Sequence, residues 1–294
     1  MTGETRIPYD EQLAETAAFA RRTAGASCRR DPKTGESCAW YHGLWQDLRA
    51  VGLGSKVSFQ ADFFAEAFSR VKKEAPRALV AGAADDAVLT HVLAACGASA
   101  VEPRVTVLDL CDTPLVLNER YAARVGRAIA TVRVDMLEHA PEEPYDAIVA
   151  HSFVGYFPPA KRRELTLRWA SMLAPSGVLI LVNRIRAGDP EAPVSFGANE
   201  AAAFCAAVEE RLRSSLSAEE LATQVARAGT YVRNHVVFAL PEGEIESHLA
   251  AAGLEVAIAK TVTAHDPRSR GVGGGVAVAS NARYACIAGA RAAR

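Results

Sequence analysis

Residues 77–109 constrain the fold most, because they read as a strand, a tight turn, a helix and a second strand. The apolar run Arg77–Ala81 is followed directly by Gly82 and a group of small and acidic residues. Residues 87–96 then have helical spacing, and the apolar run 105–109 ends in the carboxylate of Asp109. Open α/β folds use such a strand–turn–helix to hold a nucleotide-like group. The acidic residue at the end of the next strand binds the ribose hydroxyls.

The chain continues with the same alternation. Further apolar runs that predict strands are at 128–134, 145–150, 178–182, 254–263 and 282–288. Most are separated by helical patterns, as expected for parallel strands joined by crossover helices. The last two follow one another without a helix, so they should pair antiparallel. We therefore expect an α/β fold with a mostly parallel seven-stranded sheet that ends in an antiparallel hairpin.

The remaining segments predict additions to this sheet. Residues 1–74 have helical patterning throughout and predict an N-terminal helical cap on the domain formed by residues 75–294. Residues 187–233 interrupt the alternation. They begin as a loop rich in Pro and Gly and become two helical stretches, the second opened by a capping box at 217–220. We therefore expect residues 187–233 to form a helical insert in the sheet domain.

Composition narrows the class of protein. The 33 basic residues nearly cancel the 34 acidic ones, which argues against a nucleic acid or an anionic membrane as partner. No apolar run approaches the roughly 20 residues of a membrane span, and the N-terminus lacks a signal core, so a cytoplasmic protein is expected. The six cysteines form no CxxC pair, which predicts reduced thiols and no metal site. The oligomeric state is open, with a homodimer possible.

Five short strings at the predicted strand ends carry a family resemblance. They are Leu79-Val-Ala-Gly82, Val107-Leu-Asp109, Val134-Asp-Met136, Tyr145-Asp-Ala-Ile-Val-Ala-His151 and Leu173-Ala-Pro-Ser-Gly-Val-Leu179. Together with the seven-strand layout, they resemble the class I S-adenosylmethionine-dependent methyltransferases. The resemblance covers about residues 75–290 and implies a Rossmann-like domain that binds S-adenosyl-L-methionine. In this family, helices before the domain often cap the acceptor site.

The resemblance also implies which residues bind the cofactor. They are Gly82, Ala83, Asp85, Asp109, Asp135, Met136 and His151. Asp109 would bind the ribose, and Asp135 and Met136 would lie beside the adenine. The chain departs from the family at Val80, which replaces the usual acid before the glycine. Asp85 or Asp86 could supply that carboxylate to the methionyl ammonium, or could simply cap the next helix.

Candidates for the chemistry lie at the fourth strand and in an aromatic cluster. His151 ends the fourth strand at the binding edge, where it could act as a general base or orient the substrate. Tyr41 and His42 could meet the acceptor if their cluster closes the cleft, although such clusters more often pack in cores. The catalytic candidates are therefore His151, His42 and Tyr41. The candidate substrate-binding residues are Trp40, Tyr156, Arg184 and Tyr231, of which the arginine could hold an acceptor carboxylate.

The expected activity is methyl transfer to nitrogen, oxygen or sulfur of a small metabolite. The family's nucleic-acid-modifying members often carry Asn/Asp-Pro-Pro-Tyr/Phe after the fourth strand, whereas this chain has His151-Ser-Phe-Val. Two alternatives stay open. The loss of the acid at Val80 leaves room for another reaction on the same fold, such as aminopropyl transfer or cyclisation. A non-catalytic binding protein is the third possibility, against which the retained strand-end acids argue.

Overall fold

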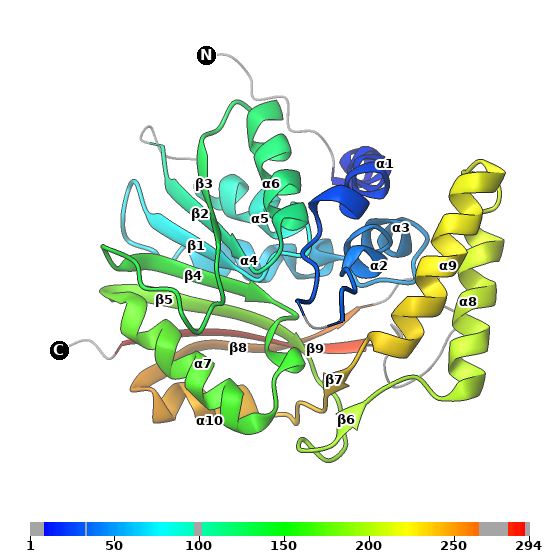
Figure 1. The fold of residues 1–294 in the computed structure, drawn as a ribbon. Coiled ribbons are helices and arrows are strands. Elements are labelled where there is room, and N and C mark those ends of the chain that lie inside the picture. The colour runs from blue at the N-terminus through cyan, green and yellow to red at the C-terminus, as the bar shows by residue number, and fades with distance from the viewer. Residues whose placement is uncertain (1–8, 33, 97–101, 265–281, 292–294) are drawn as a thin grey trace.

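The computed structural model describes residues 9–32, 34–96, 102–264 and 282–291. Seven strands form one sheet in the order β3-β2-β1-β4-β5-β9-β8 (Figure 1). They are β1 (Arg77–Ala81), β2 (Arg104–Asp109), β3 (Ile129–Arg133), β4 (Tyr145–His151), β5 (Leu173–Arg184), β8 (Leu254–Ala264) and β9 (Ala282–Arg291). Strands β1 to β5 run parallel to one another, whereas β9 runs antiparallel to both β5 and β8. The predicted parallel sheet with its C-terminal hairpin is confirmed.

Strand β5 starts earlier than its sequence predicts. The apolar run predicts a strand at 178–182, but the strand begins at Leu173 and includes the Pro-Ser-Gly segment that resembles a turn. Tyr145 pairs with Leu173 and Ala147 with Val178, so the register shifts by extra residues on β5. A bulge of this kind lets a turn-like sequence remain within a strand.

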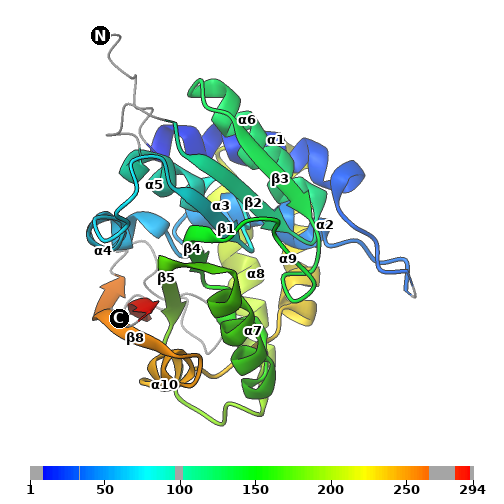
Figure 2. The ribbon, with the colours of Figure 1, turned by 90° about the vertical axis from the view of Figure 1, so that its left-hand side faces the viewer.

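Two layers of helices cover the two faces of the sheet. Helices α4 (Ala61–Phe68), α5 (Ala87–Cys96) and α6 (Asp112–Arg124) pack on one face, and α7 (Pro159–Met172) and α10 (Glu244–Ala251) pack on the other (Figure 2). None of these, nor any other described helix, combines the length and apolar character needed to cross a membrane.

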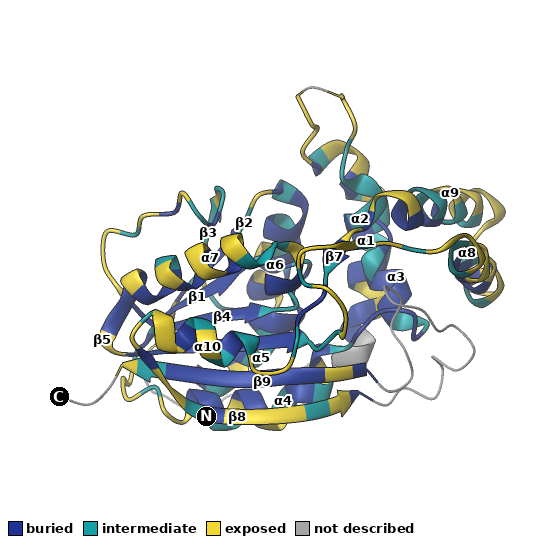
Figure 3. Cartoon of the chain, turned by 90° about the horizontal axis from the view of Figure 1, so that it is seen from below, coloured by how far each residue is buried: buried dark blue, intermediate teal, exposed yellow. Residues whose placement is uncertain are grey.

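The sheet core follows from the period-two alternation of β-strands. In β1, Ala78 and Val80 belong to the core on the α5 face, whereas Leu79 and Ala81 belong to the core on the α7 face. Central strands β1 and β4 are buried along almost their whole length, and edge strand β8 exposes many of its residues (Figure 3). Burial on both faces explains the near-continuous apolar runs in the sequence.

The N-terminal helices and the insert lie together beyond one end of the sheet (Figure 1). The helices of the first group are α1 (Tyr9–Ser27), α2 (Ala39–His42) and α3 (Trp45–Ala50). The insert provides α8 (Ala198–Leu212) and α9 (Ala218–Asn234), flanked by the short strands β6 (Pro193–Val194) and β7 (Val237–Phe238). The two predicted insert helices are present, and they share a hydrophobic core with the N-terminal segment that includes Leu44, Leu48 and Phe204. The division into cap and sheet domain remains a prediction.

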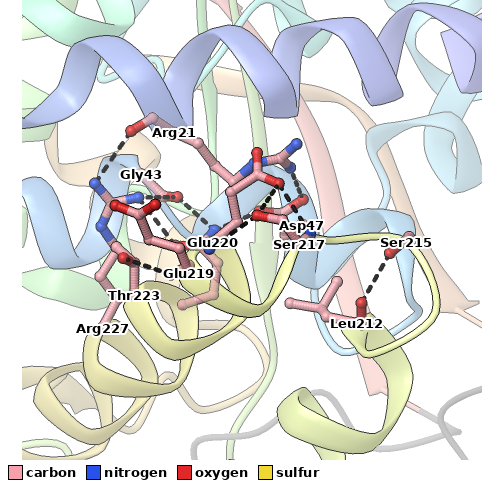
Figure 4. A network of polar contacts seen from close by, with 11 residues as sticks. Arg21, Gly43, Asp47, Leu212, Ser215, Ser217, Glu219, Glu220, Thr223 and Arg227 are labelled. Atoms are coloured by element: carbon pink, nitrogen blue, oxygen red, sulfur yellow. Dashed lines mark hydrogen bonds and ion pairs between the residues drawn. The ribbon is translucent and has the colours of Figure 1, made fainter.

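Polar contacts join α1, the α2–α3 turn and α9 (Figure 4). Arg21 Nη1 lies 2.7 Å from Asp47 Oδ1, and the guanidinium of Arg227 donates to the carbonyl oxygens of Gly43 and Arg21 at 3.0 and 3.2 Å. Burial raises the pKa of Asp47, and the charge of Arg21 opposes that rise. These contacts hold α9 against the N-terminal helices.

Candidate functional site

A cavity opens at the carboxyl ends of β1, β4 and β5, where the sheet order reverses between β1 and β4. Ligands of open α/β sheets bind at such a switch point. The cavity has a volume of about 90 Å³, and residues of the N-terminal segment and of α9 close its outer side. Among the residues predicted from sequence, it brings together Tyr41, Gly82, Asp85, His151, Tyr156, Arg184 and Tyr231.

Gly82 forms the floor of the cavity at the end of β1. Its φ of +70° is in the left-handed region that favours glycine, and its N–H donates to Leu108 O at 2.9 Å. A Cβ at this position would collide with the ring of Phe153. The turn therefore needs a glycine both for its conformation and for its space. Ala83, by contrast, is buried in the core and does not line the cavity.

A buried ion pair forms one wall of the cavity. Arg49 Nη1 in α3 pairs with Asp85 Oδ2 in the turn after β1, and both side chains are 3% exposed. Arg49 Nε also donates to Ser55 O at 2.7 Å, and Asp85 Oδ1 accepts the N–H of Ala87 at 3.0 Å. Asp85 thus caps α5 and lines the cavity at once, so the two roles weighed from sequence coexist. Arg49 was not predicted, because nothing in its helical segment marks it as functional.

Asp86 turns away from the cavity. Its Oδ2 accepts hydrogen bonds from Gln12 Nε2 at 2.6 Å and Thr16 Oγ1 at 3.0 Å, both on α1. Burial, together with the neighbouring charge of Asp85, raises the pKa of Asp86 to about 7. Asp86 therefore ties α1 to the start of α5.

The end of β4 supplies His151 and a strained backbone. His151 Nε2 lies 3.3 Å from Gln60 Oε1, and burial with the charge of Arg49 lowers the pKa of His151 to about 3. Its imidazole is therefore neutral at physiological pH. Ser152 follows with a φ of +53°, unique among the described non-glycine residues. Backbone strain of this kind costs about 1–3 kcal/mol and concentrates at functional sites.

Aromatic rings form the outer wall. Tyr41 stacks against Trp45, Tyr231 and His235, with ring centroids 5.5, 6.2 and 6.1 Å apart. Its hydroxyl accepts a hydrogen bond from the Tyr156 hydroxyl at 3.3 Å. Trp40 packs edge-on behind Tyr41 and does not line the cavity. The fold therefore brings the predicted aromatic residues of the N-terminal segment and the insert into one stack.

Strand β5 and the residues just after it contribute positive charge and a buried amide. Arg184 ends β5, Arg186 follows two residues later, and both line the cavity. Burial lowers the pKa of Arg184, and burial together with the charge of Arg184 lowers the pKa of Arg186 to about 10, so Arg186 stays charged at neutral pH. The Nδ2 atom of Asn183 is buried without a hydrogen-bond partner among the described residues. Sequence reasoning missed Asn183 because it lies inside an otherwise apolar strand.

Four further predicted residues lie outside the lining of the cavity. Asp109 follows Leu108, the residue that bonds to Gly82, and its Oδ1 accepts the N–H of Cys111 at 2.8 Å. Asp135 Oδ1 accepts the N–H of Leu137 at 2.9 Å, and Met136 is buried in the core on the α7 face. His42 is buried and does not line the cavity. The roles assigned to these residues from sequence remain predictions.

Known structures share this fold at low sequence identity. The 1,6-didemethyltoxoflavin-N1-methyltransferase of Burkholderia thailandensis, solved with S-adenosylhomocysteine, has a TM-score of 0.55 and 16% identity, covering 96% of this chain and 91% of its own. The magnesium protoporphyrin IX methyltransferase of Synechocystis PCC 6803 has a TM-score of 0.50 and 11% identity, covering 96% and 98%. The mitomycin 7-O-methyltransferase MmcR has a TM-score of 0.50 and 14% identity, covering 97% and 69%.

Neither a family model nor a curated protein matches the sequence. At these identities, the structural likeness establishes the fold. The chain has the fold of S-adenosylmethionine-dependent methyltransferases.

Proposed function

We propose that this protein transfers a methyl group from S-adenosyl-L-methionine to a nitrogen, oxygen or sulfur atom of a small molecule. The observation that carries the proposal is the cavity at the switch point of the sheet, floored by Gly82 and bordered by the end of β4. The shared fold supports it. A cavity enclosed by helices suits a small acceptor better than a nucleic acid or a protein chain.

The polar groups of the cavity fit the methionyl end of this cofactor. Asp85 and Arg49 stand side by side in the wall, and a zwitterion would meet Asp85 with its ammonium and Arg49 with its carboxylate. Asp85 would then take the place of the acid lost at Val80. The aromatic rings around Tyr41 would face the sulfonium, whose positive charge is attracted to ring faces.

The other end of the cofactor would extend toward β2 and β3. Asp109 lies beside the Gly82 turn and would accept hydrogen bonds from the ribose hydroxyls. Asp135 would lie beside the adenine. Small-molecule sites usually have volumes of roughly 300–1,000 Å³, more than the cavity of about 90 Å³. Phe153, whose ring packs on Gly82, and the partly exposed Tyr156 would have to move as the ligand enters.

The chain's own contribution to the reaction is alignment and exclusion of water. Bound S-adenosyl-L-methionine would supply an activated methyl group. A neutral amine or thioether acceptor would need no base, whereas a hydroxyl acceptor would need one. Because its pKa is lowered to about 3, His151 would be a weak base, and its neutral imidazole is better suited to orienting the acceptor. Arg184 and Arg186 favour an acceptor that carries a carboxylate or another anionic group.

Calorimetric titration with S-adenosyl-L-methionine and S-adenosylhomocysteine tests the proposal. We expect both to bind, and Asp109→Asn to weaken both, because an amide accepts hydrogen bonds from hydroxyls less strongly than a carboxylate does. Asp112→Asn is the matched control, since Asp112 is three residues away in an exposed ion pair with Arg133. Failure of both ligands to bind would overturn the proposal.

The alternative of aminopropyl transfer predicts a different ligand. Decarboxylated S-adenosylmethionine lacks the carboxylate that Arg49 would bind, so we expect it to bind more weakly than S-adenosyl-L-methionine. Tighter binding of the decarboxylated compound would support aminopropyl transfer instead. If the expected order is found, a screen of carboxylated amines, phenols and thiols with radiolabelled cofactor identifies the acceptor class.

A further inference from the structure

A cluster of three cysteines and a histidine lies outside the cavity, where the N-terminal helices meet the end of β2. Cys28 follows α1, Cys38 precedes the short helix α2, His42 ends that helix, and Cys111 precedes α6. The sulfur atoms of the three cysteines all lie within 4.8 Å of one another. The end of α1 and the start of α2 thus meet a residue more than 70 positions further along the chain.

The distances suit tetrahedral coordination of a metal ion. Zinc–thiolate bonds of about 2.3 Å place the sulfur atoms of a tetrahedral site about 3.8 Å apart. Cys38 Sγ and Cys111 Sγ are 3.5 Å apart, and Cys28 Sγ is held by Thr113 Oγ1 at 3.0 Å. The three thiols therefore need only small movements to share one ion.

His42 is the candidate for a fourth ligand beside the three cysteines. His42 follows Cys38 by four residues, and its backbone N–H donates to the backbone oxygen of Cys38 at 3.2 Å. Both side chains therefore belong to one helical turn. The imidazole is 7% exposed, and its Nδ1 atom has no hydrogen-bond partner among the described residues. The imidazole thus offers a buried nitrogen beside the cluster, and it would have to move closer to the three sulfur atoms to bind the same ion.

We propose that Cys28, Cys38, His42 and Cys111 bind one zinc ion. Soft thiolates with an imidazole in a closed four-ligand set are typical of structural zinc sites. Bonds from the ion would connect α1, α2 and the start of α6, and would fix the end of β2 two residues after Asp109. This site has a structural role and is independent of the proposed methyl transfer.

Residue spacing does not reveal this site, because its ligands are spread over 84 residues, from Cys28 to Cys111. Only Cys38 and His42 have a spacing typical of a ligand pair. The expectation of no metal site rested on spacing alone, whereas the fold brings the remaining ligands together.

Metal analysis of the full chain tests the proposal, after removal of any purification tag and under reducing conditions. We expect one zinc ion per chain, released when the thiols are modified. Cys38→Ser and Cys111→Ser should each lose most of the zinc. Cys205→Ser is the control and should retain it, because Cys205 lies on α8 outside the cluster.

A second measurement uses the wild-type chain, so it does not depend on whether a variant folds. Chelation followed by addition of cobalt(II) should produce the visible absorption of a tetrahedral thiolate complex. Absence of stoichiometric zinc together with absence of this absorption would overturn the proposal. A Cys38–Cys111 disulfide in protein prepared with zinc and without reductant, found by mass spectrometry, would also overturn it in favour of a redox pair. Neither result depends on cofactor binding, so each is separate from the test of the proposed function.

Discussion

Gly82 combines two constraints that can be separated by substitution. Gly82→Ala would cost about 1–2 kcal/mol for the left-handed backbone and would also force its Cβ against the Phe153 ring. Gly253→Ala is the matched control, because Gly253 has a φ of +72° and a Cβ added there would have nothing within 4 Å. We expect a lower melting temperature in both variants, and loss of S-adenosylhomocysteine binding by calorimetry in Gly82→Ala alone. Equal binding by the two variants would contradict a role for Gly82 in the site.

Asp86 should make stability depend on pH. Its folded pKa of about 7 lies above the unfolded value of 3.8, so the folded state holds its proton more tightly. The stability linked to this proton is complete below the unfolded pKa and is lost as pH rises through about 7, with about 1.4 kcal/mol for each pKa unit.

Asp86→Asn removes this titration and keeps an acceptor for Gln12 and Thr16. We expect the variant to gain stability over the wild type above pH ~7 and to match it near pH ~4, as measured by urea unfolding at each pH. Asp62→Asn, at an exposed position of α4, is the control and should leave the pH dependence unchanged. A constant difference between Asp86→Asn and the wild type at all pH values would contradict the prediction.

Helix α3 is connected to the turn after β1 by the ion pair of Arg49 and Asp85. Removal of one member leaves a buried charge without its partner, which typically costs about 3–5 kcal/mol. We expect Arg49→Met and Asp85→Asn each to be strongly destabilising, and the double variant to be less destabilised than the sum of the two. Urea unfolding of the four proteins gives the coupling energy, and additive effects would mean that the two side chains do not depend on each other.

The elements of the sheet were predictable, whereas the contacts between distant elements were not. Strand β1 and helix α5 are found within the bounds that the apolar runs indicate, because burial on both faces imposes a period that sequence displays. Arg49 and Cys111 are two residues whose contacts could not be predicted from the sequence. Each sits in an ordinary local pattern, and its partner lies at least 36 residues away, so only the folded chain shows what it contacts.

The N-terminal segment and the insert close the cavity from outside the sheet. Tyr41 and Tyr231 come from these two segments and stack on one another, while Arg21, Asp47 and Arg227 connect the helices behind them. Because the cavity is smaller than a typical small-molecule site, these segments and the residues over Gly82 are the parts that must adjust on binding. The rings that stack in the outer wall come from the N-terminal segment and the end of the insert, and the sheet supplies the floor beneath them.

Hydrogen exchange measured with and without S-adenosylhomocysteine should therefore change at one end of the molecule. We expect added protection in α2, α3 and the last turn of α9, together with the segments at Gly82 and His151, since these border the cavity. Helices α7 and α10 serve as the internal control. They pack on the face of the sheet that does not carry α5, and no residue of α10 lines the cavity. Added protection in α10 equal to that in α3 would mean that the ligand stabilises the whole fold and does not close the N-terminal segment over the site.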